Sequence, residues 1–122
     1  MARALVLIVE DEPLVRLNAA EMIEDAGYVT LQAASADEAL ALLETVPRIR
    51  AVFTDINLGS SMNGIALAVV IHDRWPPIAL ILTSGHFHSG EADLPPRSQF
   101  LAKPYNGRQL GGALDSFDLK AS

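Results

Sequence analysis

Short apolar runs alternate with segments of helical periodicity along the whole chain. The runs of strand length are mostly apolar throughout, as expected for strands that are covered on both faces. Strands are predicted at residues 4–9, 28–34, 50–55, 78–83 and 99–102. Helices are predicted at residues 13–27, 36–45, 63–75 and 106–117. Strands that alternate with helices in this way predict a parallel sheet with helices on both faces.

Residues that typically start or stop helices mark the ends of the predicted helices. Pro13 suits the first turn of a helix, and Gly27 is a natural C-terminal stop. Between them, Leu14, Leu17 and Met22 form an apolar stripe with helical spacing. A capping-box signature opens the second helix, two adjacent prolines stop the third, and two adjacent glycines weaken the last. The capping residues are Ser35 and Glu38, and the prolines are Pro76 and Pro77.

The segment 85–98 interrupts the alternation of strands and helices. It reads GHFHSGEADLPPRS, with two glycines and two adjacent prolines, and it shows no helical stripe. We expect a loop, or at most one distorted turn, so that the fourth helix of the fold is short or degenerate. His86 and His88 have no evident third ligand, and we interpret them as solvated surface residues.

Composition limits the class of protein. The chain has 122 residues, half of them hydrophobic and a fifth charged, which fits one globular domain over residues 1–122. There is no cysteine, so disulfides and thiolate metal sites are excluded. A formal charge of -6 argues against direct nucleic-acid binding. No apolar run approaches the roughly 20 residues of a membrane helix. We therefore expect a cytoplasmic protein without membrane or nucleic-acid partners.

Polar residues follow four of the five predicted strands. Because the carboxyl ends of parallel strands meet at one edge, where ligands bind in doubly wound sheets, these residues are expected to converge. They are Glu10, Asp11 and Glu12 after the first strand, Asp55 after the third, Thr83 and Ser84 after the fourth, and Lys103 after the fifth. Two or three close carboxylates raise one another's pKa unless a cation is present. The set suits Mg²⁺, which takes one or two carboxylates together with waters and a phosphate.

The convergence predicts a site for in-line phosphoryl transfer. Asp55 would be the nucleophile, and Mg²⁺ would remove the charge barrier to an anionic donor. Lys103 and the Thr83 hydroxyl would hold the remaining phosphoryl oxygens. The simpler interpretations are that Asp55 caps a turn and that the acidic residues 10–12 only complement a helix dipole. Neither explains why carboxylates, hydroxyls and an ammonium group gather together at strand ends.

Four short motifs carry a family resemblance. LIVEDEP, VFTD, ILTS and FLAKPY, in this order and at these spacings, resemble the receiver domain of two-component response regulators. The resemblance covers essentially the whole chain. It implies a flavodoxin-like, doubly wound sheet of five parallel strands with helices on both faces. It also implies that Asp55 accepts a phosphoryl group from a phosphohistidine donor, either a histidine kinase or a histidine phosphotransferase.

The resemblance assigns further roles by position. Asp11 matches a direct Mg²⁺ ligand, Glu10 a ligand through water, and Asn57 the residue whose backbone carbonyl completes the metal shell. Thr83 matches the switch hydroxyl, and Phe100 the aromatic residue that turns inward on activation. Lys103 matches the lysine that contacts the phosphoryl group. It precedes a proline across a peptide bond that is cis in the family, which would aim the lysine at the site.

The chain departs from the family pattern in three places. Leu58 and Gly59 replace a Met-Pro pair, which should make the loop after Asp55 more mobile. The first acidic residue is Glu10, where the family commonly has an aspartate. In the family the fourth helix, fifth strand and fifth helix form the usual output and dimer face. A degenerate fourth helix would therefore affect a homodimer and the Phe100 switch.

Two other functions remain alternatives. One is a receiver-fold interaction module whose phosphorylation-dependent output is altered or lost, which the irregular segment 85–98 favours. The other is a Mg²⁺-dependent phosphohydrolase with an aspartate nucleophile. Such an enzyme wants a second acid two residues after the nucleophile, and this chain has Asn57 there. We therefore expect a signalling switch rather than an enzyme.

Overall fold

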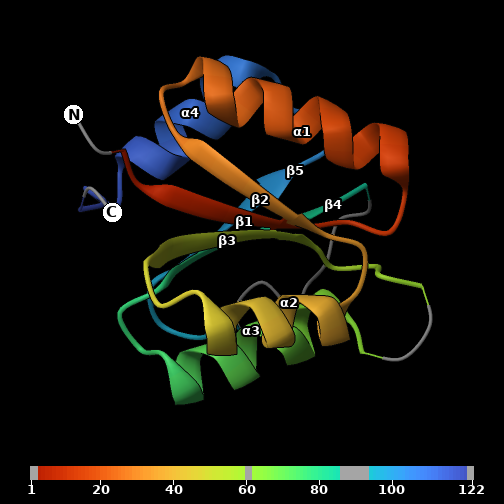
Figure 1. Ribbon diagram of the computed structural model, residues 1–122. Helices are drawn as coiled ribbons and strands as arrows, with labels where there is room; N and C mark the ends of the chain where they lie inside the picture. Colours follow the sequence, from red (N-terminus) through yellow and green to blue (C-terminus); the bar gives the residue numbers. More distant parts are fainter. Residues whose placement is uncertain (1–2, 60–61, 86–93, 121–122) are drawn as a thin grey trace.

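The computed structural model describes residues 3–59, 62–85 and 94–120 and forms a sheet covered by helices on both faces (Figure 1). The strands are β1 (Leu5–Val9), β2 (Val29–Ala33), β3 (Ile49–Asp55), β4 (Ala79–Ser84) and β5 (Ser98–Ala102). The helices are α1 (Pro13–Asp25), α2 (Ala36–Thr45), α3 (Gly64–Arg74) and α4 (Gly107–Asp115). All nine elements lie within about two residues of the predicted ranges.

The sheet has the order β2-β1-β3-β4-β5, and every neighbouring pair is parallel. The order reverses at β1, so the carboxyl ends of β1 and β3 flank the switch point at which such sheets bind ligands. α1 and α4 cover one face and α2 and α3 the other (Figure 1). The doubly wound, flavodoxin-like architecture predicted from the sequence is confirmed.

Consecutive strand residues supply the two cores. In β1, Leu7 packs on the side of α2 and α3, while Ile8 packs on the side of α1 and α4. Both side chains are 0% exposed, and Leu80 and Ile81 repeat the arrangement in β4. Side chains alternate between faces along a strand, so a sheet covered on both sides needs apolar residues at every position. This need accounts for the unbroken apolar runs in the sequence.

Capping hydrogen bonds place the helix starts where the sequence predicts them. The Ser35 hydroxyl accepts from the Glu38 backbone N–H at 3.1 Å at the start of α2. Asn63 caps α3 by accepting from the Ala66 N–H at 2.8 Å. Asn106 caps α4 in a full capping box. Each cap satisfies backbone donors that the first helical turn leaves without partners.

The sequence predicts an apolar stripe of three residues on α1, but two of these residues do not pack against the core. Leu14 and Leu17 are 75% and 49% exposed, and only Met22 packs against the core. The buried face is formed by Ala19, Ala20 and Ile23. Small alanines bring the helix axis close to the sheet, and the larger leucines lie on its outer side. The exposed leucines leave an apolar surface near the start of α1.

Helices α1 and α4 approach closely at the glycine pair expected to weaken α4. Gly111 is buried, and a Cβ atom built on it would lie 3.1 Å from the Ala26 Cβ. The glycine therefore costs helix propensity but permits the contact. The sequence predicts a short or degenerate fourth helix within residues 85–98. Residues 86–93, with His86 and His88, lie outside the described residues, residues 94–97 form no helix, and Ser98 begins β5.

Candidate functional site

The candidate site lies at the carboxyl edge of the sheet, where the register aligns the strand ends. Asp55 pairs with Thr83 across β3 and β4, and Thr83 pairs with Leu101 across β4 and β5. The Lys103 N–H donates to the Ser84 carbonyl at 3.0 Å and prolongs this pairing by one residue. The sequence-predicted residues of four different segments thus meet at one pocket of about 310 Å³. Its acidic and basic lining residues are Glu10, Asp11, Glu12, Asp55 and Lys103.

Asp55 is the buried centre of the pocket, with only 7% of the residue exposed. The Lys103 ammonium donates to its Oδ2 atom. The Asn57 backbone N–H donates to its Oδ1 atom at 2.8 Å. A carboxylate away from water is costly unless it is paired and hydrogen-bonded. The lysine and the amide meet that requirement on both oxygens.

Glu10 is a second buried carboxylate, also 7% exposed. Its Oε2 atom accepts from the Glu12 backbone N–H at 3.0 Å, and its Oε1 atom lies 3.9 Å from the Lys103 Nζ. Burial, together with the adjacent Asp11 and Asp55 carboxyls and against the opposing Glu12 amide, raises the pKa of Glu10 to about 7. Negative charge is therefore only partly compensated here, so a cation would be favoured.

Asp11 lies beside the loop that follows β3. A Cβ atom built on Gly59 would be 2.9 Å from the Asp11 Oδ2. Gly59 has φ +84°, a conformation that side chains other than glycine rarely adopt. Gly59, which stands where the family commonly has a proline, thus allows a turn that brings this loop against Asp11. Asn57 shapes the same turn, because its Oδ1 atom accepts from the Gly59 N–H at 3.3 Å.

The Thr83 hydroxyl bonds to β5, and Phe100 packs against the core. The Thr83 hydroxyl is buried and donates to the Leu101 carbonyl at 2.6 Å. Phe100 is partly buried and packs against the core on the side of α2 and α3. Sequence reasoning placed Thr83 at the site, and its backbone is there. Its hydroxyl is bonded to the neighbouring strand.

Two further residues shape the site and were not among the predicted site residues. Gly64 donates its N–H to the Ile56 carbonyl at 2.7 Å, so the start of α3 lies directly against the end of β3. The Asn63–Gly64 pair, which caps and begins α3, is the sequence signal for this approach. Tyr105 packs edge-on against Phe53, with ring centroids 5.6 Å apart. It follows the Lys103–Pro104 peptide bond, which is cis.

The donor set fits a hard divalent cation. Glu10, Asp11 and Asp55 present carboxylate oxygens to one pocket, and oxygen ligands are those that Mg²⁺ takes in proteins. Within residues 3–59, 62–85 and 94–120, no three acidic or histidine side chains lie close enough together to hold a metal ion by themselves. Mg²⁺ needs only one or two carboxylates when water and phosphate supply the rest.

Comparison with known proteins identifies the family. The response regulator receiver domain model matches residues 6–115. The chain belongs to the response regulator receiver domain family. As a receiver domain, it is 34% identical over 109 residues to the nitrogen assimilation regulatory protein NtrX of Azorhizobium caulinodans, covering 86% of this chain and 24% of that protein. It is 33% identical over 111 residues to the sensor kinase CckA of Brucella abortus, covering 88% of this chain and 12% of that protein.

Solved structures agree with this assignment. A response regulator receiver protein from Sinorhizobium medicae is 27% identical, with a TM-score of 0.87 over 94% of each chain. The receiver domain of NtrX from Brucella abortus is 30% identical, with a TM-score of 0.80 over 92% of this chain and 96% of that one. The receiver domain spans a quarter or less of the two curated relatives named above. None of the helices in the described ranges is long and apolar enough to cross a membrane.

Proposed function

We propose that this receiver domain accepts a phosphoryl group on Asp55 from a phosphohistidine donor. The observation that carries the proposal is the buried Asp55 carboxylate, which contacts Lys103 and opens on a pocket with Glu10 and Asp11. An Asp55 oxygen would form a bond to phosphorus while the bond from phosphorus to the donor imidazole breaks. The departing imidazole keeps the electron pair, so the step needs no other reactant.

We propose Mg²⁺ as the cation of this site. Asp11 and Asp55 would hold it directly and Glu10 through a water molecule, with the Asn57 backbone carbonyl as a further ligand. When bound, the ion neutralises negative charge between the carboxylates and the incoming phosphoryl group. Burial beside the Asp11 and Asp55 carboxyls raises the pKa of Glu10, and a bound cation would offset the cost of keeping these groups ionised, which supports this assignment. Lys103 supplies the second positive charge and holds a phosphoryl oxygen.

The proposed switch acts through Thr83. Phosphorylation adds charge and strong acceptor oxygens at Asp55. The Thr83 hydroxyl would leave the Leu101 carbonyl, where it now donates at 2.6 Å, and donate to the phosphoryl group instead. Because Thr83 and Leu101 are register partners, this exchange would change the local bonding of β5, on which Phe100 lies. Phe100 would then carry the change to the surface.

The exposed start of α1 supports a protein phosphodonor. Leu14, Val15 and Leu17 are 75%, 36% and 49% exposed, and Val15 also lines the phosphorylation pocket. A second hollow of about 480 Å³ lies beside it and includes Lys103 and Tyr105. An apolar surface next to a reactive pocket suits a docking partner. We propose a histidine kinase or histidine phosphotransferase there, with the domain acting in the cytoplasm as a signalling phosphoacceptor.

A mass measurement tests the proposal directly. The intact protein is incubated with Mg²⁺ and acetyl phosphate, beside Asp55→Asn and the matched control Asp37→Asn, an exposed residue on α2. We expect the gain of one hydroxylamine-labile phosphoryl group in the parent and in Asp37→Asn, and no gain in Asp55→Asn. No gain in the parent, together with failure to bind beryllofluoride, would instead indicate a receiver fold used only for interaction.

The phosphohydrolase alternative is disfavoured by the loop after Asp55. The residue two positions on is Asn57, whose side chain accepts from the Gly59 N–H and offers no acid. The phosphohydrolase function would be supported if the parent protein hydrolysed small phosphate esters and the Asp55→Asn variant did not. We expect stoichiometric labelling without such turnover.

A further inference from the structure

Arg16, near the start of α1, holds the loop that carries the acidic residues of the site. Its Nη1 atom donates to the Glu10 backbone carbonyl at 2.9 Å, and its Nε atom donates to the Gln32 side-chain carbonyl at 3.2 Å. The rigid guanidinium thus joins three segments, which are the loop after β1, the end of β2 and α1. Arg16 was not among the predicted site residues.

The bond from Arg16 fixes the peptide group between two acidic residues of the proposed Mg²⁺ site. A peptide group is planar, so the direction of the Glu10 carbonyl sets the plane that joins the Cα atoms of Glu10 and Asp11. On the other side of the residue, the Glu10 N–H donates to the Ala33 carbonyl at 3.1 Å. The backbone on both sides of Glu10 is therefore held in place by protein contacts.

Arg16 acts at a helix start that has no side-chain cap. Side chains cap the starts of α2, α3 and α4, whereas none caps α1 at Glu12 among the described residues. Arg16 instead connects the start of α1 to the loop before it. Its bond to the Glu10 carbonyl is partly buried, so water competes with it less than at an open surface.

We propose that Arg16 is a positioning residue for Mg²⁺ binding and phosphoryl uptake at Asp55. It would act through the peptide group between Glu10 and Asp11, and it would contact neither the metal ion nor the phosphoryl group. Backbone that is already ordered loses less entropy when a cation binds, so the bond from Arg16 would raise the affinity for Mg²⁺. This inference rests on the proposed function, because it needs the proposed Mg²⁺ site.

The direction of the change in Mg²⁺ affinity distinguishes positioning from a simple effect of charge. A positive charge near an acidic site opposes a cation, so charge alone would make Arg16→Gln bind Mg²⁺ more tightly. Loss of positioning would instead weaken binding by about tenfold, as for other residues that orient metal ligands. Amide NMR shifts of Asp11 and Gly59 during a Mg²⁺ titration measure the affinity. Arg16→Lys keeps the charge without the planar fork and should fall between the two proteins.

Phosphoryl uptake should show the same division. Arg16→Gln should need more Mg²⁺ for half-maximal labelling of Asp55 by acetyl phosphate. At saturating Mg²⁺ its labelling rate should be close to that of the parent protein, because Arg16 contacts neither reactant. A residue that bound the phosphoryl group would lower the saturated rate instead.

Hydrogen exchange in EDTA tests the positioning without any metal ion. The Glu10 N–H is protected by its bond to the Ala33 carbonyl. Arg16→Gln should increase its exchange rate severalfold relative to the Leu7 N–H, which lies inside β1 and reports global opening. Gln32→Leu removes the acceptor of the Arg16 Nε atom and should give a smaller change in the same direction.

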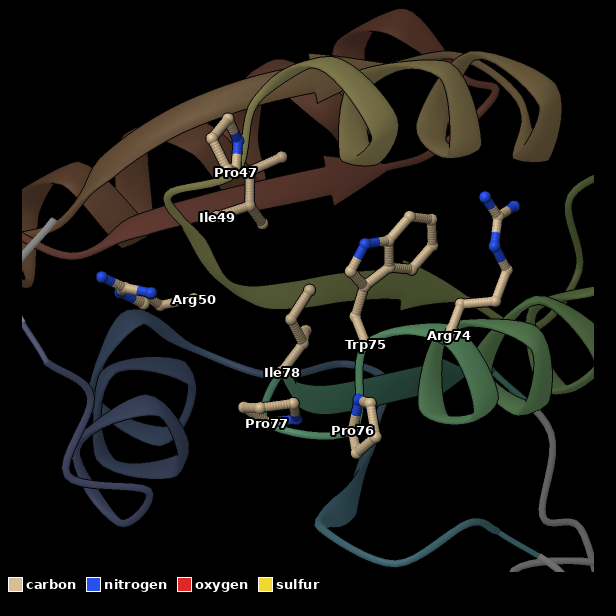
Figure 2. Close-up of a pocket in the computed structure, with 8 residues that line it drawn as sticks. All are labelled: Pro47, Ile49, Arg50, Arg74, Trp75, Pro76, Pro77 and Ile78. Carbon is tan, nitrogen blue, oxygen red and sulfur yellow. The ribbon is translucent and has the colours of Figure 1, made fainter.

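Arg74→Gln is the matched control. Arg74 is also a helix arginine with a side-chain partner, since it donates to Glu44 at 3.0 Å. It lies beside Trp75 in a separate pocket of about 240 Å³ near the starts of β3 and β4 (Figure 2). Asp55 is at the other end of β3, and a seven-residue strand spans about 20 Å. Arg74→Gln should therefore leave Mg²⁺ affinity and Glu10 exchange unchanged.

The outcomes separate this inference from the proposed function. Unchanged or tighter Mg²⁺ binding in a folded Arg16→Gln variant would overturn the positioning role, and so would an unchanged ratio of Glu10 to Leu7 exchange. A parent protein that bound Mg²⁺ but took up no phosphoryl group would contradict the proposed function, whereas the affinity and exchange measurements would still decide the role of Arg16.

Discussion

Gly64 and Asp55 lie so close that no side chain fits between them. A Cβ atom built on Gly64 would be 2.2 Å from the Asp55 carbonyl oxygen and 2.8 Å from the Ile56 Cα. Both neighbours are backbone atoms, so they cannot move aside as a flexible side chain would. The loop that follows Asp55 and the start of α3 therefore hold one another in place.

The Gly64→Ala variant should displace this loop. We expect a loss of about 2–3 kcal/mol of unfolding free energy, because backbone must shift to relieve the overlap. Phosphoryl uptake from acetyl phosphate should also slow, since Asp55 moves with its backbone. Urea denaturation and intact mass measure the two effects.

Gly112→Ala is the matched control for that substitution. A Cβ atom on Gly112 meets nothing within 4 Å, and the residue is exposed on α4. The alanine should stabilise the protein by about 0.5–1 kcal/mol through helix propensity. If Gly64→Ala behaved like Gly112→Ala, the close approach would not constrain the site.

The buried Glu10 should make stability fall as pH rises. Its pKa is about 7 in the folded protein and near the ordinary 4.5 when unfolded, so the folded state binds more protons between these values. Stability contributed by this group is complete below about pH 4.5 and is lost as pH rises through 7. Glu10→Gln should remove this decline and raise unfolding free energy at pH 8 by roughly 1–3 kcal/mol. Urea denaturation from pH 5 to 8, without Mg²⁺, measures both proteins. A parallel pH dependence in the two would contradict the assignment.

Mg²⁺ should stabilise the protein more at pH 8 than at pH 5. Ionised carboxylates bind the cation, whereas protonated Glu10 does not. A Mg²⁺ concentration ten times the dissociation constant stabilises by about 1.4 kcal/mol. Thermal denaturation of the parent and of Asp11→Asn measures the effect, and the variant should gain less. Equal stabilisation of the two proteins would remove Asp11 from the proposed ligand set.

The Thr83→Val variant should be less stable but should still take up a phosphoryl group. The substitution keeps the shape of the side chain but removes the hydroxyl that donates to Leu101. We expect a loss of about 1–2 kcal/mol in unfolding free energy, because a partly buried hydrogen bond to the Leu101 carbonyl is lost. Asp55 should still be labelled by acetyl phosphate, but phosphorylation should no longer alter the NMR signals of β5. A normal response of β5 in the variant would exclude Thr83 as the switch.

The sequence by itself determined the order of elements and the edge at which the polar residues meet. Apolar runs of strand length can be buried on both faces only within a helix-covered parallel sheet, and a parallel sheet brings its carboxyl ends together. Glu10, Asp55 and Lys103 could thus be assigned to one site from their positions after strands. Capping residues such as Ser35 and Asn63 fixed the helix starts through local hydrogen bonds.

Tertiary structure decided what depends on contacts between distant segments. Leu14 and Leu17 have helical spacing, but the close approach of Ala19 and Ala20 to the sheet turned them outward. The Thr83 hydroxyl could have faced Asp55 or β5, and strand register gave it the Leu101 carbonyl. The pocket beside Trp75 is built where the segments before β3 and β4 meet. Spacing along a chain sets which side of its own element a residue occupies, whereas packing sets which neighbour it meets.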